Sequence, residues 1–190
     1  MSRVPALSGE STRLLAGARL LVLDVDGTLT DGSVTYLGDV ELARFHVHDG
    51  QGLVWLRQAG VELSWISGRG STAVEKRAAE LGVKELHLGV GAKGAVLADV
   101  QRRLAIAPAQ TVAMGDDLVD LAWLARAALF VAPADARPEV RARAGLVTAA
   151  GGGAGAVREL CEAWLSAKGL WRERVERASV AEERAARAGE

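Results

Sequence analysis

The chain has 190 residues, and a size of about 150 residues per domain predicts one domain with at most a short appendage. Hydrophobic residues make up 49% and charged residues 25%, a globular composition that excludes an intrinsically disordered chain. The 23 basic and 24 acidic residues leave a net charge of −1, so we expect no nucleic-acid partner. The single cysteine, Cys161, excludes a disulfide framework and a zinc site built from cysteines.

Residues 1–13 mix Ser, Gly, Pro and Glu without a period, which predicts a flexible, frayed lead-in. The apolar run over residues 14–23 is interrupted by Arg19 and followed by Asp24, and it is too short to span a bilayer. We therefore expect no membrane partner and a soluble protein in the cytoplasm.

From residue 20 onward, short apolar runs alternate with amphipathic stretches. The predicted strands cover residues 20–23, 61–66, 85–88, 111–114 and 129–131, and the predicted helices cover residues 52–58, 71–81, 93–104, 118–127, 138–143 and 156–167. This alternation predicts an α/β fold with three layers, a Rossmann-like parallel sheet with helices on both faces. Such sheets bind ligands at the carboxyl ends of their strands.

Two segments depart from this rhythm. Two alternating segments around Gly38-Asp39 predict a protruding β-hairpin over residues 33–48. Residues 171–190 are rich in Arg, Glu and Ala with balanced charges, which predicts a solvated helix or a loose C-terminal tail. A single domain is therefore expected over residues 14–170.

Residues 20–32, LLVLDVDGTLTDG, carry the strongest chemical signal. Asp24 ends a predicted strand and Asp26 follows two residues later; two carboxylates so close repel each other unless a cation such as Mg²⁺ lies between them. A carboxylate beside Mg²⁺ can attack a phosphoryl group and form an aspartyl phosphate. The alternative, an Asx turn after the strand, explains one Asp and the glycine but not the whole Asp-x-Asp-Gly-Thr pattern.

DVDGT resembles the first motif of the haloacid dehalogenase superfamily of phosphatases. Further segments follow in that superfamily's order near successive predicted strand ends: ISGR at 66–69, GAKG at 91–94 and GDDLVD at 115–120. Taken singly, Ser67 would be a helix N-cap, Lys93 a solvated lysine and the acidic run a favourable helix N-terminus. Together, in order, they are specific.

Two further segments indicate a particular family within this superfamily. The hairpin with FHVHDG at 45–50, and GGAGAVRE at 152–159, resemble the 3-deoxy-D-manno-octulosonate 8-phosphate phosphatases, a likeness that covers roughly residues 20–165. This resemblance implies a homotetramer without a cap domain, in which hairpins pack together and a neighbouring subunit helps to close the site. The gaps over residues 31–66 and 68–92 support the absence of a cap, because a domain below about 40 residues rarely folds alone.

The resemblance also implies a site. Asp24 would be the nucleophile, Asp26 the acid and base, and Ser67 and Lys93 would hold the phosphoryl oxygens. Mg²⁺ would be held by Asp24, the Asp26 main-chain carbonyl and Asp116, with Asp117 and Asp120 as positioning groups. Substrate contacts are expected from Asp26, His46, His48, Asp49, Gly50, Arg69, Arg77 and Lys93.

The chain departs from the family at three positions, since His48, Val54 and Ala154 stand where the family carries Arg. Guanidinium groups are natural partners of a sugar carboxylate. His46 and His48 lie two apart on a predicted strand and would share a face.

The sequence thus predicts a Mg²⁺-dependent phosphatase that releases phosphate from 3-deoxy-D-manno-octulosonate 8-phosphate. One alternative is a phosphatase for a nine-carbon keto-sugar acid 9-phosphate. Another is a non-catalytic assembly domain linked to sugar-acid activation, although Asp24 and Asp26 are both present. A phospho-accepting receiver would carry its acceptor Asp after the third strand, where this chain has Gly89-Val90-Gly91.

Overall fold

The computed structural model describes residues 7–177, and in these residues a sheet of parallel strands forms the centre of the molecule. The sheet order is β5-β4-β1-β6-β7-β8. The strands are β1 (Leu20–Leu23), β4 (Glu62–Ile66), β5 (Glu85–His87), β6 (Thr111–Met114), β7 (Leu129–Ala132) and β8 (Leu146–Val147). Every neighbouring pair is parallel, which confirms the predicted sheet.

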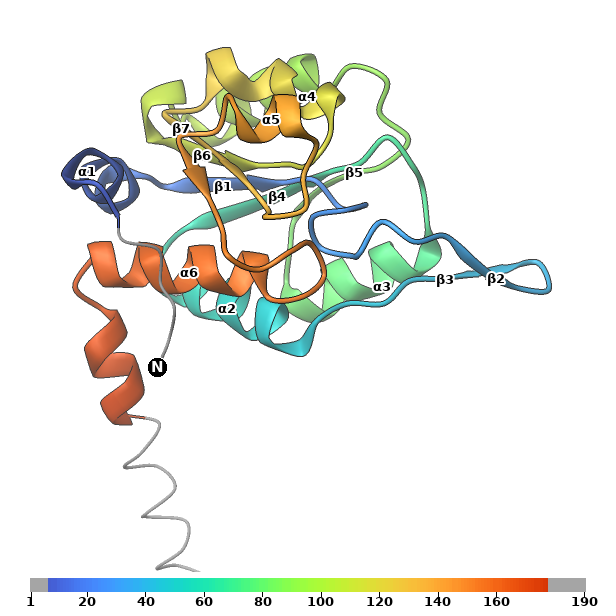
Figure 1. Cartoon of the computed structure of the whole chain (residues 1–190), viewed down its shortest axis with the longest axis horizontal. Helices are drawn as coiled ribbons and strands as arrows, with labels where there is room; N and C mark the ends of the chain where they lie inside the picture. The colour runs from blue at the N-terminus through green and yellow to red at the C-terminus, as the bar shows by residue number, and fades with distance from the viewer. Residues whose placement is uncertain (1–6, 178–190) are drawn as a thin grey trace, which may run out of the picture.

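Helices cover both faces of the sheet, as Figure 1 shows. One layer holds α2 (Val47–Gln58), α3 (Thr72–Leu81) and α6 (Ala156–Ala167), and the other holds α4 (Lys93–Leu104), α5 (Pro138–Arg141) and the 3₁₀ helices η1 (Pro108–Gln110) and η2 (Leu118–Arg126). Successive side chains of a strand point to opposite faces. Leu21 and Leu23 of β1 therefore join the core under α2 and α6, while Leu20 and Val22 join the core under α4.

The hairpin β2 (Thr35–Leu37) and β3 (Val40–Leu42) projects away from the sheet (Figure 1). Gly38 turns the chain at a φ of +58°, a conformation that glycine adopts without steric cost. The two strands and their turn cover residues 35–42 of the predicted 33–48, and residues 47 and 48 belong to α2.

Helix α2 begins five residues earlier than the sequence predicts, and the reason is close packing. A Cβ on Gly52 would lie 3.0 Å from the Cβ of Cys161 in α6, and a Cβ on Gly50 would overlap the Arg77 guanidinium. Glycine is a poor helix former, so helix propensity does not predict a helix over the residues that precede Gly52. His46 is the N-cap of α2 and His48 lies in its first turn, so the prediction that both lie on a strand is wrong.

Helix α1 (Gly9–Gly17) includes residues 9–13 of the predicted frayed lead-in. Ser8 caps it by accepting a hydrogen bond from the Ser11 N–H at 3.0 Å, and Leu15 is fully buried. Capping and one buried face are enough to hold so short a helix against α6. Residues 1–6 lie outside the described residues.

At the other end of the chain, residues 171–177 are helical and Trp171 packs on Trp55, 5.7 Å between ring centroids; the rest of the predicted tail lies outside the described residues. Among residues 7–177, no helix combines the length and the apolarity needed to cross a membrane.

Candidate active site

The candidate site lies where three neighbouring strands end. Asp24 follows β1, Ser67 follows β4 and Asp116 lies two residues after β6, and β1 is flanked by β4 and β6. The chain runs from β1 to β4 on one side and returns to β6 on the other, so this edge is the switch point at which parallel sheets form a crevice. Residues up to 92 positions apart in sequence are thereby brought together.

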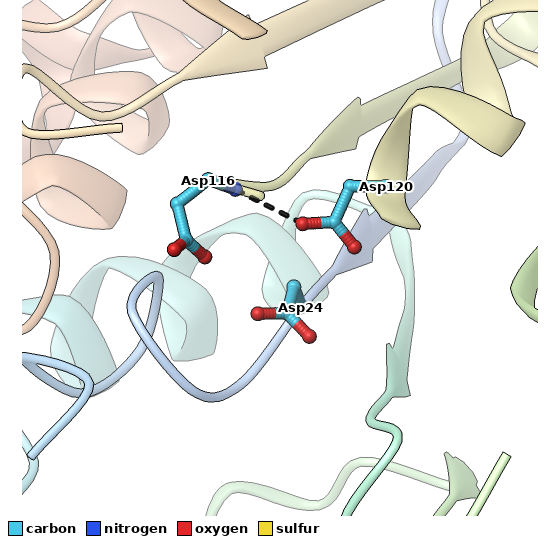
Figure 2. A group of neighbouring side chains, drawn as sticks. All are labelled: Asp24, Asp116 and Asp120. Carbon is cyan, nitrogen blue, oxygen red and sulfur yellow. Dashed lines mark hydrogen bonds between the residues drawn. The ribbon is translucent and has the colours of Figure 1, made fainter. Parts of the chain in front are cut away.

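Three carboxylates form the centre of this site (Figure 2). Asp24, Asp116 and Asp120 each offer an oxygen, and these oxygens lie within 4.8 Å of one another. Burial, together with the negative charge of Asp120, raises the pKa of Asp24 well above its usual range, and burial followed by the same charge raises the pKa of Asp116 to about 6. A divalent cation would relieve this repulsion, and an all-oxygen donor set suits Mg²⁺.

Asp120 uses both of its carboxylate oxygens inside the protein. One accepts hydrogen bonds from the N–H groups of Asp116 and Asp117, at 3.0 and 3.1 Å, and the other accepts one from Lys93 Nζ at 2.7 Å. Asp120 therefore holds the loop after β6 in place, and Asp24 and Asp116 are the carboxylates better placed to bind a metal.

Lys93 is buried between two acids. Its Nζ donates to Asp24 Oδ1 at 2.5 Å and to Asp120 Oδ1 at 2.7 Å. Burial alone would lower the pKa of Lys93, but the charges of Asp24 and Asp120 outweigh it and raise that pKa overall. The site thus contains a fixed positive charge next to the candidate nucleophile.

Ser67 holds the second aspartate of the first motif. Its Oγ donates to Asp26 Oδ2 at 2.9 Å and accepts a hydrogen bond from the Arg69 N–H at 3.0 Å. The N-cap of α3 is Ser71, so the alternative that Ser67 caps this helix is wrong. Arg69 lies 3.8 Å from Asp26 and 2.9 Å from Glu41 of the hairpin, and so connects the two.

The other expected substrate contacts lie around the start of α2. The rings of His46 and His48 meet edge to face, 5.1 Å between centroids, and His48 is exposed. Gly50 lies against the Arg77 guanidinium. Asp49 is only 1% exposed, and its Oδ1 accepts a hydrogen bond from the Arg158 N–H of α6 at 2.7 Å. Its Oδ2 is buried without a hydrogen-bond partner in the described residues, so the expected contact with substrate stays a prediction.

Two hydrogen bonds that shape the site were not predicted from the sequence. Thr28 donates a hydrogen bond to Asp116 Oδ1 at 3.1 Å and so links the first motif to the fourth. The Gly153 N–H donates to the Thr28 carbonyl at 3.1 Å, which fixes the glycine run beside the first motif. The run of glycines was the available signal, because such runs allow close backbone approach.

Comparisons with known proteins agree with this geometry. Residues 89–157 match the family of haloacid dehalogenase-like hydrolases. The chain is 43% identical over 153 residues to the 3-deoxy-D-manno-octulosonate 8-phosphate phosphatase KdsC of Escherichia coli, covering 80% of this chain and 81% of that one.

Two solved structures are also similar. The 3-deoxy-D-manno-octulosonate 8-phosphate phosphatase of Yersinia pestis matches with a TM-score of 0.85 and 36% identity, covering 87% of this chain and 90% of that one. The enzyme of the same name from Moraxella catarrhalis, in complex with a magnesium ion, a phosphate ion and KDO, matches with a TM-score of 0.84 and 34% identity, covering 87% of this chain and 95% of that one.

Proposed function

Because the chain belongs to the 3-deoxy-D-manno-octulosonate 8-phosphate phosphatases of the haloacid dehalogenase superfamily, we propose that it hydrolyses this sugar-acid phosphate in a Mg²⁺-dependent reaction. The products are 3-deoxy-D-manno-octulosonate and phosphate. The observation that carries the proposal is the arrangement of Asp24 beside Lys93 Nζ, at 2.5 Å, within an acidic cluster that fits a divalent cation.

Asp24 is the proposed nucleophile. Its carboxylate oxygen forms a bond to phosphorus while the bond from phosphorus to the sugar oxygen breaks, which leaves an aspartyl phosphate. Asp26, held by Ser67, gives a proton to the leaving oxygen and then takes one from the water that hydrolyses the aspartyl phosphate. After the two steps, Asp24 is again a free carboxylate and Asp26 again carries its proton.

Mg²⁺ would be held by Asp24, Asp116 and the main-chain carbonyl of Asp26, and when bound it neutralises charge on the transferring phosphoryl group. Lys93 and Ser67 hold the phosphoryl oxygens, one as a buried cation and the other as a hydroxyl donor. Asp117 and Asp120 position the loop after β6; Asp117 accepts a hydrogen bond from the Leu118 N–H at 2.8 Å.

The sugar acid is proposed to contact His46, His48, Asp49, Gly50, Arg69 and Arg77. Arg69 supports this assignment because it is half exposed at the edge of the site and lies between Asp26 and the hairpin residue Glu41. A nine-carbon keto-sugar acid 9-phosphate is the second candidate, since His48, Val54 and Ala154 offer no guanidinium for the carboxylate.

We also propose that the protein acts in the cytoplasm as a homotetramer whose subunits are joined through their hairpins. The hairpin exposes large apolar side chains that a lone subunit leaves in water: Val34, Tyr36, Leu37, Val40 and Leu42. A two-stranded hairpin is marginal by itself, which favours burial of this surface by other copies.

The direct test is a hydrolysis screen of the purified protein against eight- and nine-carbon sugar-acid phosphates and neutral sugar phosphates, with and without Mg²⁺. We expect Mg²⁺-dependent phosphate release that is fastest with the eight-carbon substrate. Release that persists after chelation, or no release from any sugar-acid phosphate, would contradict the proposal.

A further inference from the structure

Trp123 contacts Lys93 at both ends of that residue. Its indole Nε1–H donates to the Lys93 main-chain carbonyl at 3.2 Å, and Lys93 Nζ lies 5.3 Å from the centroid of its ring. Trp123 itself is fully buried. One side chain thus fixes the backbone of Lys93 and also offers the face of a π-system to the ammonium group.

The local structure of η2 places Trp123 there. In a 3₁₀ helix, side chains three residues apart eclipse one another, so Asp120 and Trp123 lie on the same side of η2. Both contact Lys93. Gly94, the residue after Lys93, lets α4 approach, because a Cβ there would lie 3.2 Å from the Ala122 carbonyl oxygen.

Other buried tryptophans lack this relationship. Trp65 and Trp164 are also fully buried, yet their indole N–H groups have no hydrogen-bond partner in the described residues. Both belong to the core on the opposite face of the sheet. Packing alone explains those two side chains but not the directed contacts that Trp123 makes.

We propose that Trp123 is a positioning residue that holds the Lys93 ammonium in place throughout phosphoryl transfer, an inference that rests on the proposed function. When Asp24 bonds to phosphorus and the sugar oxygen leaves with a proton from Asp26, Asp24 no longer carries a carboxylate charge. Lys93 then loses part of its attraction to Asp24. Asp120 and the Trp123 ring are unchanged by the step, so they keep Nζ at the phosphoryl oxygens.

The kinetic test compares Trp123→Phe and Trp123→Leu with the matched control Trp164→Phe. We expect Trp123→Phe, which keeps a ring but loses the N–H, to lower kcat about three- to tenfold, and Trp123→Leu to lower it about ten- to a hundredfold. KM should change less than kcat for Trp123→Phe, because the contacts with the sugar are untouched. Trp164→Phe should leave both constants within about twofold per mole of folded protein, counted by circular dichroism.

A second measurement needs no turnover. Calorimetric titration of inorganic phosphate into the Mg²⁺-loaded protein should show Kd at least about threefold weaker in Trp123→Phe and unchanged in Trp164→Phe. Equal behaviour of these two variants in both measurements would overturn the inference, and Trp123→Phe decides if Trp123→Leu does not fold.

The experiments distinguish a failure of the proposed function from a failure of the inference about Trp123. If the wild type binds phosphate but hydrolyses no sugar-acid phosphate, the proposed function fails and the phosphate titration alone decides the role of Trp123. If the Mg²⁺-loaded wild type binds no phosphate, the inference about Trp123 is overturned as well.

Discussion

The backbone of Gly152 lies against that of Gly27 so closely that a Cβ on Gly152 would overlap the Gly27 carbonyl oxygen and lie 2.6 Å from the Gly27 carbonyl carbon. This contact joins the loop before α6 to the turn that follows Asp26. The placement of the first motif therefore depends on a residue at the far end of the domain.

Gly152→Ala should displace this turn. We expect kcat to fall at least about tenfold and the free energy of unfolding to fall by about 1–3 kcal/mol, as for other overpacked sites. Urea denaturation and steady-state kinetics measure the two effects. Gly17→Ala is the control, because a Cβ there meets nothing within 4 Å; an equal loss in both variants would show that the Gly152 contact is unimportant.

Asp24→Asn should abolish phosphatase activity, with a loss of at least ~10⁴-fold in kcat, because the amide keeps the shape of the side chain but removes the nucleophile. In the absence of metal the variant should be at least as stable as the wild type, since Asp24 is buried beside Asp116 and Asp120. Thermal unfolding checks stability. Turnover near the wild-type rate would refute the assignment of the nucleophile.

Mg²⁺ should stabilise the protein in a pH-dependent way. In the metal-free protein, burial raises the pKa of Asp116 to about 6, so the folded state binds this proton more tightly than the unfolded state does. The contribution of Asp116 to stability is then greatest below its unfolded pKa and is lost as the pH rises to about 6. Above that pH the carboxylate is free to bind the metal.

We expect Mg²⁺ at about 100 times its Kd to add about 2.7 kcal/mol near pH 7.5, and clearly less near pH 5, where protons compete for the site. Thermal unfolding with and without Mg²⁺ at both pH values measures this difference. Asp116→Asn should lose most of the increment at the higher pH. A Tm shift that does not change between the two pH values would argue against this metal site.

We expect the exposed apolar side chains of the hairpin to hold the subunits together. Leu37 and Val40 are 71% and 57% exposed, so the double change Leu37→Asp and Val40→Asp should leave the fold intact but convert a tetramer to smaller species and weaken turnover. Light scattering measures the mass, with Asp39→Ser at the same turn as the control. A fully active wild-type monomer would rule out closure of the site by neighbouring copies.

How far the sequence predicts this molecule depends on the kind of interaction that fixes each part. The strands β1 and β6 are predicted to the residue, because short apolar runs such as LLVL that end at turn residues are typical of strands covered on both faces. The start of α2 was missed at Gly50 and Gly52, where contacts with Arg77 and α6 outweigh helix propensity. Long-range packing of this kind leaves no periodic signal.

The candidate site shows the same division. Asp24, Ser67, Lys93 and Asp116 follow or lie near strand ends, so the rule for parallel sheets predicts that they lie together. The hydrogen bond from the Arg158 N–H to Asp49 joins α6 to α2, and the local sequence gives no signal for such a contact between residues 109 positions apart. The contact of Trp123 with Lys93 cannot be predicted from the sequence, because an indole N–H bonded to a backbone carbonyl 30 residues away has no counterpart in the local sequence.

The residue at position 154 should influence which sugar acid the enzyme prefers. Ala154 is exposed in the glycine run, and its neighbour Gly153 donates a hydrogen bond to the Thr28 carbonyl at 3.1 Å, so position 154 lies close to the first motif. The family that this chain resembles carries an Arg there, and a site without that charged partner should discriminate less, by ~1.5–3 kcal/mol or roughly ten- to a hundredfold. We therefore expect the wild type to hydrolyse the eight-carbon acid phosphate with a weak preference over nine-carbon acid and neutral sugar phosphates.

Ala154→Arg should restore the preference, raising kcat/KM for the eight-carbon substrate more than for a neutral sugar phosphate, because a guanidinium can bind a carboxylate through two parallel hydrogen bonds. Ala154→Gln is the matched control, with a long polar side chain and no charge. The ratio of the two kcat/KM values is the measurement, since a general effect on folding or on the chemical step cancels in it. If Ala154→Arg leaves the ratio unchanged or lowers it, position 154 does not contact the carboxylate, and a nine-carbon substrate becomes the better candidate.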